Sequence, residues 1–191
     1  YNADDRVELS EIFNGNEALI KKYAEKLSIS FERVEYAKNN FIRVVKVMKA
    51  FILNDSVKSF LCLNNKLPQE NKGLFDIKLL EEFADAIIKL YGIRGLKGKD
   101  LLYSINSEDY DAKRAEFIQR LSKGEKLFVI SSYNTVGAGQ NLQYKAPGNA
   151  TIVAVNDYDR GDMEKDFDCI YLEKPTNLLV NVDSKKGIEA E

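Results

Sequence analysis

Apolar and polar positions follow two different patterns along this chain. Between residues 14 and 55, apolar side chains recur every three or four positions, which predicts helices over 17–27 and about 30–53. Residues 1–13 are acidic and mixed and show no clear period. From residue 56 onward, short continuous apolar runs alternate with segments of helical period. Such alternation is typical of a mostly parallel sheet joined by right-handed crossovers.

Five apolar runs predict the strands of that sheet. They lie at 57–63, 101–105, 127–130, 151–155 and 167–172. Helices are expected at 77–91 and about 108–122. Asp76 can cap the first of these helices, and Gly92 and Gly124 are natural C-terminal stops. The predicted fold class is therefore α/β, with a parallel-sheet domain over 56–191 and a helical appendage over 1–55.

The helix expected over about 30–53 carries basic residues opposite its apolar side. They are Arg33, Lys38, Arg43, Lys46 and Lys49. One interpretation is a surface for the phosphate backbone of a nucleic acid, and the other is an ordinary solvated helix face. The net charge of −2 provides no overall basic field that would favour the first interpretation.

Composition excludes several classes of chemistry. The chain has 191 residues, of which 45% are hydrophobic and 30% charged, so a packed core is expected. It contains no histidine, which excludes Ser-His-Asp and Cys-His mechanisms and argues against a zinc site. No apolar run approaches the ~20 residues of a membrane span, so no membrane partner is expected. Cys62 and Cys169 lie in apolar runs and are predicted to be buried free thiols in a reducing, cytoplasmic compartment.

Three familiar binding motifs fit the sequence poorly. Gly98-Lys99 is followed by Asp100 and lacks the first glycine of a Walker A loop. Gly137-x-Gly139 matches only part of the dinucleotide fingerprint, because Leu142 stands at the third glycine position. A group of aspartates fits no metal-binding loop and is read as part of a solvated insertion. These are Asp157, Asp159, Asp162, Asp166 and Asp168.

The strongest chemical signal lies in the segment 126–142, KLFVISSYNTVGAGQNL. It opens as a buried strand and continues with small hydroxyl residues and glycines. Ligands of parallel sheets bind outside the carboxyl ends of the strands, where free backbone N–H groups can meet an anion. A ligand site is therefore expected directly after the strand at 127–130. A tight turn beneath a packed helix would also explain Gly137 and Gly139.

Residues 132–142 resemble motif V of superfamily 2 helicases and translocases. The G-x-G-x-N-L ending is most similar to SWI/SNF-type remodelling ATPases and to bacterial DEAD/DEAH-type helicases. The likeness covers about residues 56–180, since 57–63 resembles the motif IV strand and 167–172 the strand before motif VI. It implies that residues 56–191 form the C-terminal RecA-like domain of a nucleic-acid-dependent ATPase.

The resemblance also implies roles for individual residues. Ser131, Ser132, Tyr133 and Thr135 would contact nucleic-acid phosphates. Gly137, Gly139 and Asn141 would face an ATP cleft shared with a first RecA-like lobe. ATP and Mg²⁺ would be the cofactors of the intact parent protein, and DNA is favoured over RNA as its partner. No catalytic or metal-binding residue is assigned to this chain.

Two departures from the family pattern keep a second hypothesis open. Position 133 holds Tyr in place of the usual small hydroxyl residue. The arginine pair of motif VI is absent, and the last arginine is Arg160. The chain begins with Tyr1, so we expect it to be a piece of a longer protein that is inactive alone. The alternative is a non-catalytic α/β protein-interaction module that kept the fold and lost the ATPase motifs.

Overall fold

The computed structural model describes residues 3–32, 34–67, 75–136, 142–148 and 164–173. Three helices come first: α1 (Ala3–Ile12), α2 (Glu17–Ser30) and α3 (Glu35–Leu53). The alternating region consists of β1 (Ser59–Asn64), α4 (Ile77–Leu90), α5 (Gly98–Leu101), β2 (Leu102–Ser104), α6 (Tyr110–Ser122), β3 (Leu127–Ser132) and α7 (Tyr133–Val136). Three short strands follow: β4 (Tyr144–Lys145), β5 (Glu164–Lys165) and β6 (Cys169–Leu172). The predicted α/β class with N-terminal helices is confirmed.

Four strands form one parallel sheet in the order β2-β3-β1-β6. Phe60 of β1 lies in register with Phe128 of β3 and with Cys169 of β6. The chain crosses from β1 to β2 through α4 on one face and returns to β3 through α6 on the other, so both crossovers have the same hand. β4 and β5 pair in a separate antiparallel ladder. The strand predicted at 151–155 lies outside the described residues.

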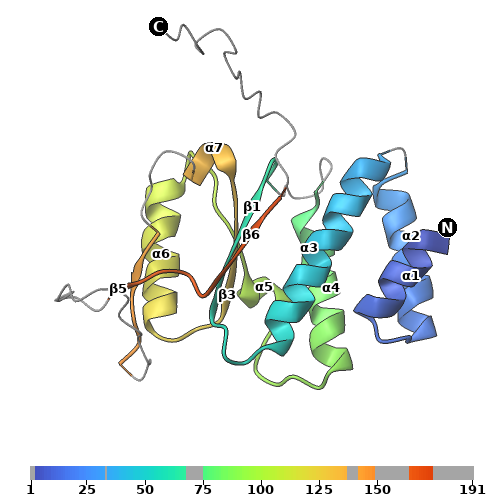
Figure 1. Cartoon of the computed structure of the whole chain (residues 1–191), viewed down its shortest axis with the longest axis horizontal. Helices are drawn as coiled ribbons and strands as arrows, with labels where there is room; N and C mark the ends of the chain where they lie inside the picture. The colour runs from blue at the N-terminus through green and yellow to red at the C-terminus, as the bar shows by residue number, and fades with distance from the viewer. Residues whose placement is uncertain (1–2, 33, 68–74, 137–141, 149–163, 174–191) are drawn as a thin grey trace, which may run out of the picture.

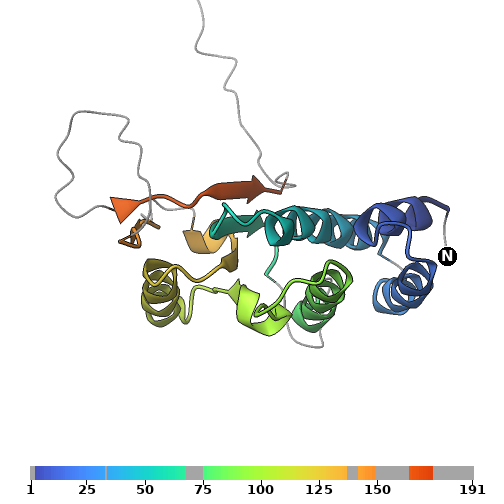
Figure 2. The ribbon, with the colours of Figure 1, turned by 90° about the horizontal axis from the view of Figure 1, so that it is seen from below.

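Helices cover both faces of the two central strands. Phe60 and Cys62 of β1 point into the core shared with α3 and α4, whereas Leu61 and Leu63 point toward α6. Every residue of β1 and β3 is buried for this reason, which explains their continuous apolar runs. Figure 1 shows α6 on one side of the sheet, α3 and α4 on the other, and α1 and α2 beyond them. Figure 2 shows the same order from below.

The residues that were predicted to begin α4 and to end α4 and α6 do so in the structure. Asp76 accepts a hydrogen bond from the backbone N–H of Lys78 at the start of α4. Gly92 and Gly124 have φ angles of 67° and 82°, which favour glycine and end α4 and α6. Gly98 approaches the carbonyl of Glu81 so closely that an added Cβ would lie 2.5 Å from that oxygen. Gly98 therefore has a packing role.

The N-terminal helices differ from the prediction in two respects. Residues 3–12 form α1, although no helical period was found there, because Leu9, Ile12 and Phe13 are fully buried against other helices. The long helix begins at Glu35 and not near residue 30, because Phe31 ends α2 and packs on Phe41 with ring centroids 5.4 Å apart. Residues 3–53 share one core with the sheet.

On the basic side of α3, Lys38 and Lys46 are bonded to carboxylates of α1, Arg43 is exposed, and Arg33 lies outside the described residues. Lys38 is buried and bonds to Asp5 at 2.8 Å and to Glu35 at 3.0 Å, while Lys46 pairs with Glu8 and Glu11 of α1. Burial alone would lower the pKa of Lys38, but its bonds to the two carboxylates hold that pKa above the ordinary value. α1 therefore docks on α3 through ion pairs that the sequence pattern could not reveal.

The prediction that both cysteines are buried is wrong for Cys169 of the edge strand β6. Cys62 is a fully buried free thiol, but Cys169 is a free thiol that is only partly buried. Cys169 lies on β6, at the border of the sheet, where α6 does not reach; Ile170 and Leu172 are more than half exposed there. In the part of the chain that the structure describes, no helix has the length and apolar character needed to cross a bilayer.

Candidate functional site

The carboxyl ends of β1, β3 and β6 meet at one edge of the sheet. We call this the carboxyl edge; it consists of Asn64, Asn65, residues 131–136 and Glu173, together with Tyr36 of α3. Figure 1 shows α7 and the first turn of α3 at this same end of the sheet. All four predicted nucleic-acid-binding residues lie here, on the last two residues of β3 and on α7.

Ser131 is held inside the fold. It is fully buried, and its hydroxyl donates to the carbonyl of Ile105 at 3.1 Å. Ile105 follows β2, so this bond joins the ends of two neighbouring strands. The hydroxyl of Ser131 therefore serves the sheet and is not presented at the surface.

Ser132 and Thr135 form a local pair at the start of α7. Their hydroxyl oxygens lie 2.9 Å apart, and the backbone N–H of Thr135 donates to the hydroxyl of Ser132 at 3.3 Å. Ser132 thus accepts from the first turn in the manner of a helix cap. The bond between the two hydroxyls uses only one of their two hydrogens, so the other hydrogen remains available as a donor to a phosphate.

Tyr133 is turned toward Glu173, a residue that sequence reasoning did not single out. The Tyr133 hydroxyl donates to the carbonyl oxygen of Glu173 at 2.5 Å. Burial, and then the negative charge of Glu173, raise the pKa of Tyr133 above its ordinary value. The hydroxyl therefore stays protonated and remains a donor at neutral pH.

Glu173 connects three parts of the carboxyl edge. Its side chain is buried, with Oε2 accepting from the backbone N–H of Asn65 at 2.7 Å and Oε1 accepting from the Tyr36 hydroxyl at 3.1 Å. Its own backbone N–H donates to the carbonyl of Leu63 at 2.9 Å. A glutamate directly after an apolar strand is the only sequence signal for this role, and it is a weak one.

Beneath Glu173 lies a small polar group on the α3 side of the sheet. The Cys62 thiol donates weakly to Asn64 Oδ1 at 3.6 Å, and burial followed by the charge of Glu173 raises the pKa of Cys62. Asn64 is fully buried, yet its Nδ2 has no hydrogen-bond partner among the described residues. A buried amide nitrogen of this kind needs a partner such as an ordered water.

The remaining predicted residues lie outside the described part of the chain. These are Gly137, Gly139 and Asn141 of the expected nucleotide cleft, and Asp157, Asp159 and Asp162 of the aspartate group. Asp168 has a structural role, since it accepts from the backbone N–H groups of Lys58 and Ser59 and pairs with Lys165. Within the described ranges no three His, Cys, Asp or Glu residues are placed to hold a metal ion.

ATP and Mg²⁺, which the family resemblance implies, therefore cannot be fitted to the described residues alone. Neither a phosphate-binding lysine loop nor a carboxylate group suited to Mg²⁺ is present among them.

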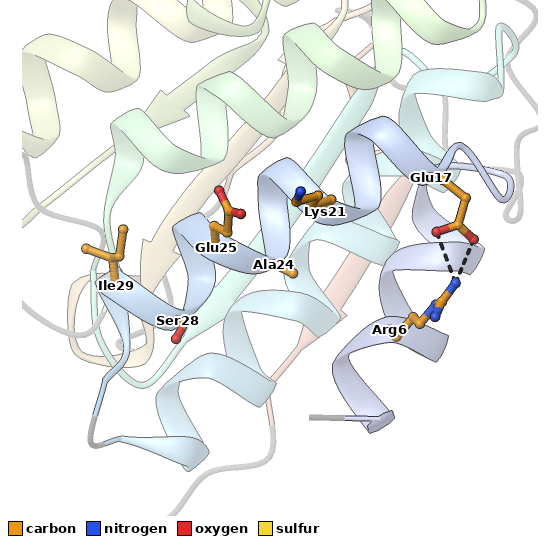
Figure 3. A pocket seen from close by; sticks show the side chains of 7 residues that line it. All are labelled: Arg6, Glu17, Lys21, Ala24, Glu25, Ser28 and Ile29. Atoms are coloured by element: carbon orange, nitrogen blue, oxygen red, sulfur yellow. Dashed lines mark hydrogen bonds and ion pairs between the residues drawn. The ribbon is translucent and has the colours of Figure 1, made fainter. Parts of the chain in front are cut away.

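A cavity of about 630 Å³ lies far from the carboxyl edge, between α1 and α2. Figure 3 shows its lining, in which Arg6 forms an ion pair with Glu17 at 2.9 Å across one end and Ile29 lies at the other. The lining side chains are mostly exposed and oppositely charged, and they bring together no group suited to catalysis. We therefore take the carboxyl edge as the candidate site.

Comparison of the sequence with models of protein families and with curated proteins gives no match.

Proposed function

We propose that this chain supplies the second RecA-like lobe of a nucleic-acid-dependent ATPase of the helicase or translocase type. One observation carries the proposal: the motif that resembles motif V leaves a central strand of a parallel sheet at its carboxyl end. Sheets of this kind bind their ligands at that end. The alternation of strands and helices and the common hand of the crossovers agree with a RecA-like arrangement.

In this proposal the chain positions a nucleic-acid strand and does not itself perform the chemistry. α7 and the hydroxyl pair of Ser132 and Thr135 would lie against the backbone, where contacts fix register without reading sequence. ATP and Mg²⁺ would be bound mainly by the first lobe, and Asn141 would reach the cleft between the lobes. DNA is the proposed partner, in keeping with the resemblance to SWI/SNF-type ATPases.

The test is the ATPase activity of the natural full-length protein, with and without single-stranded DNA, duplex DNA or RNA. Activity should rise with nucleic acid and fall at least tenfold, about 1.4 kcal/mol in the barrier, in the double variant Gly139→Ala, Asn141→Ala. Lys123→Ala is the matched control, because Lys123 is exposed at the end of α6 remote from the carboxyl edge. An ATPase rate that is the same with and without nucleic acid would contradict the proposal.

A non-catalytic interaction module is the second candidate. It is favoured because two of the hydroxyls that were expected to bind phosphate are bonded inside the chain. Ser131 bonds to the carbonyl of Ile105, and Tyr133 bonds to the carbonyl of Glu173. A folded full-length protein that neither hydrolyses ATP nor binds any nucleic acid would select this candidate.

A further inference from the structure

Tyr36 is an exposed aromatic residue whose hydroxyl is anchored by a hydrogen bond. It lies in the first turn of α3 with 52% of its surface exposed, and its hydroxyl donates to Glu173 Oε1 at 3.1 Å. An exposed tyrosine can satisfy its hydroxyl with water. The bond from the Tyr36 hydroxyl to a buried carboxylate is therefore not needed merely to satisfy the hydroxyl.

The residue that anchors Tyr36 is itself buried and held by several hydrogen bonds. Glu173 is 2% exposed and makes three further hydrogen bonds, to the backbone N–H of Asn65, the carbonyl of Leu63 and the hydroxyl of Tyr133. Tyr36 approaches Glu173 from the α3 side of the sheet, and Tyr133 packs on the α6 side. A ring fixed in this way loses little conformational freedom when a flat ligand binds to it.

Charges near Tyr36 are mixed and do not form a basic groove. Arg43 lies two turns further along α3 and makes no ion pair within the described ranges, but a cavity of about 390 Å³ beside it is lined by carboxylates. These are Asp4, Asp5, Glu8 and Glu35. The lysines of α3 are occupied by α1, so this surface can neutralise few phosphates. A polyanion would have to be held here by contacts other than charge.

We propose that Tyr36 is a stacking platform for a base of single-stranded nucleic acid, with Glu173 as its positioning residue. The inference rests on the proposed function and gives α3 a part in it. Aromatic side chains stack on unpaired bases whatever the sequence, whereas the bases of a duplex are already stacked on one another. A single strand crossing the carboxyl edge would meet Tyr36, in the first turn of α3, and the start of α7. Figure 1 shows these two elements at the same end of the sheet.

The chain contains no tryptophan, so a single tryptophan can report stacking directly. We would compare the fluorescence of Tyr36→Trp and Tyr91→Trp during titration with an oligothymidine of about 15 nucleotides. This length is near the upper limit of what a single-strand-binding domain covers. Tyr91 is a matched control, because it is 38% exposed, has Lys49 above its ring at 5.4 Å and follows α4 at the opposite end of the sheet. Saturable quenching is expected at position 36 and not at position 91.

Affinity is measured in parallel by the anisotropy of a labelled oligonucleotide. Tyr36→Leu should weaken binding about tenfold, because the stacking surface is lost. Tyr36→Phe keeps the ring and loses the anchor, so its affinity should lie between those of the leucine variant and the parent chain. The affinity should also depend only weakly on salt, with a logarithmic slope shallower than about −2, since few phosphates are contacted.

The outcomes separate this inference from the proposed function. Oligonucleotide binding without quenching at position 36, or with equal affinity for duplex and single strand, overturns the stacking role and leaves the proposed function standing. Urea unfolding of Tyr36→Leu gives the fraction of unfolded molecules under the conditions of the binding assay. If that fraction accounts for the whole loss of binding, the stacking role is also overturned. Absence of binding by both this chain and the full-length protein overturns both.

Discussion

The two ends of the parallel sheet are built in different ways. At the amino end, Ser59, Tyr144 and Asp168 form a closed network: the hydroxyls of Ser59 and Tyr144 lie 2.9 Å apart, and the backbone N–H of Asp168 donates to Ser59 at 2.9 Å. Ser59 and Tyr144 are almost completely buried. This network fastens β4, β5 and β6 to the start of β1.

The carboxyl edge is polar as well, but its polar groups are not all bonded to one another among the described residues. The amide nitrogen of Asn64 is buried without a partner among the described residues, and Tyr36 is half exposed above a buried carboxylate. A closed network stabilises a fold, whereas unsatisfied donors and exposed aromatic rings are typical of places where a ligand or water completes the bonding. The contrast between the ends is therefore an argument for function at the carboxyl edge.

The largest expected effect comes from a change between the two ends. Phe128 is fully buried on β3 and stacks on Phe60 with ring centroids 4.9 Å apart. Phe128→Ala should lower the free energy of unfolding by about 3–5 kcal/mol, because it leaves a cavity in the core between the sheet and α3. Hydrogen exchange should show the same loss of protection at both ends. A loss confined to one end would show that the ends are not parts of one cooperative unit.

A smaller effect is expected at the amino end. Asp168→Asn removes the charge that accepts from two backbone N–H groups and from Lys165, so the free energy of unfolding in urea should fall by about 1–3 kcal/mol at neutral pH. Asp111→Asn, on the exposed first turn of α6, is the control and should lose about 0.5 kcal/mol or less. Equal losses in both variants would mean that the amino-end network contributes nothing.

Acid should reveal the same network. Partial burial would raise the pKa of Asp168, but its hydrogen bonds to Lys165, Ser59 and Lys58 hold that pKa below the ordinary 3.8. A lowered pKa in the folded state stabilises the fold above the unfolded pKa, and this stabilisation is lost as the pH falls through the folded pKa. The difference in stability between the parent chain and Asp168→Asn should therefore shrink below about pH 4.

The smallest effect is expected at the carboxyl edge. Asn64→Leu replaces a buried amide whose nitrogen has no partner among the described residues, so the free energy of unfolding should change by no more than about 1 kcal/mol. Cys62→Ala serves as the companion variant, since it removes only the weak thiol bond to Asn64 and a small buried volume. A loss of about 3 kcal/mol in Asn64→Leu would indicate that a tightly held water or another group satisfies the amide and that this end is also closed.

Local sequence signals determined the course of the chain. The apolar runs at 57–63 and 127–130 became β1 and β3, and Asp76, Gly92 and Gly124 end or begin their helices as predicted. These features depend on residues close together in the sequence, such as a cap and the N–H two residues away. The position of Ser131, Ser132, Tyr133 and Thr135 at the carboxyl edge also followed, because a strand in a parallel sheet must end there.

Tertiary structure decided what those positions contact. Tyr36 and Glu173 are 137 residues apart in the sequence, and no local period connects them. The pairing of Lys38 with Asp5 is equally invisible along the chain, because α1 gains its helical form by burying Leu9 and Ile12 against other helices. Periodicity records which side of an element is apolar, but the partner of a polar side chain is set by how the elements pack.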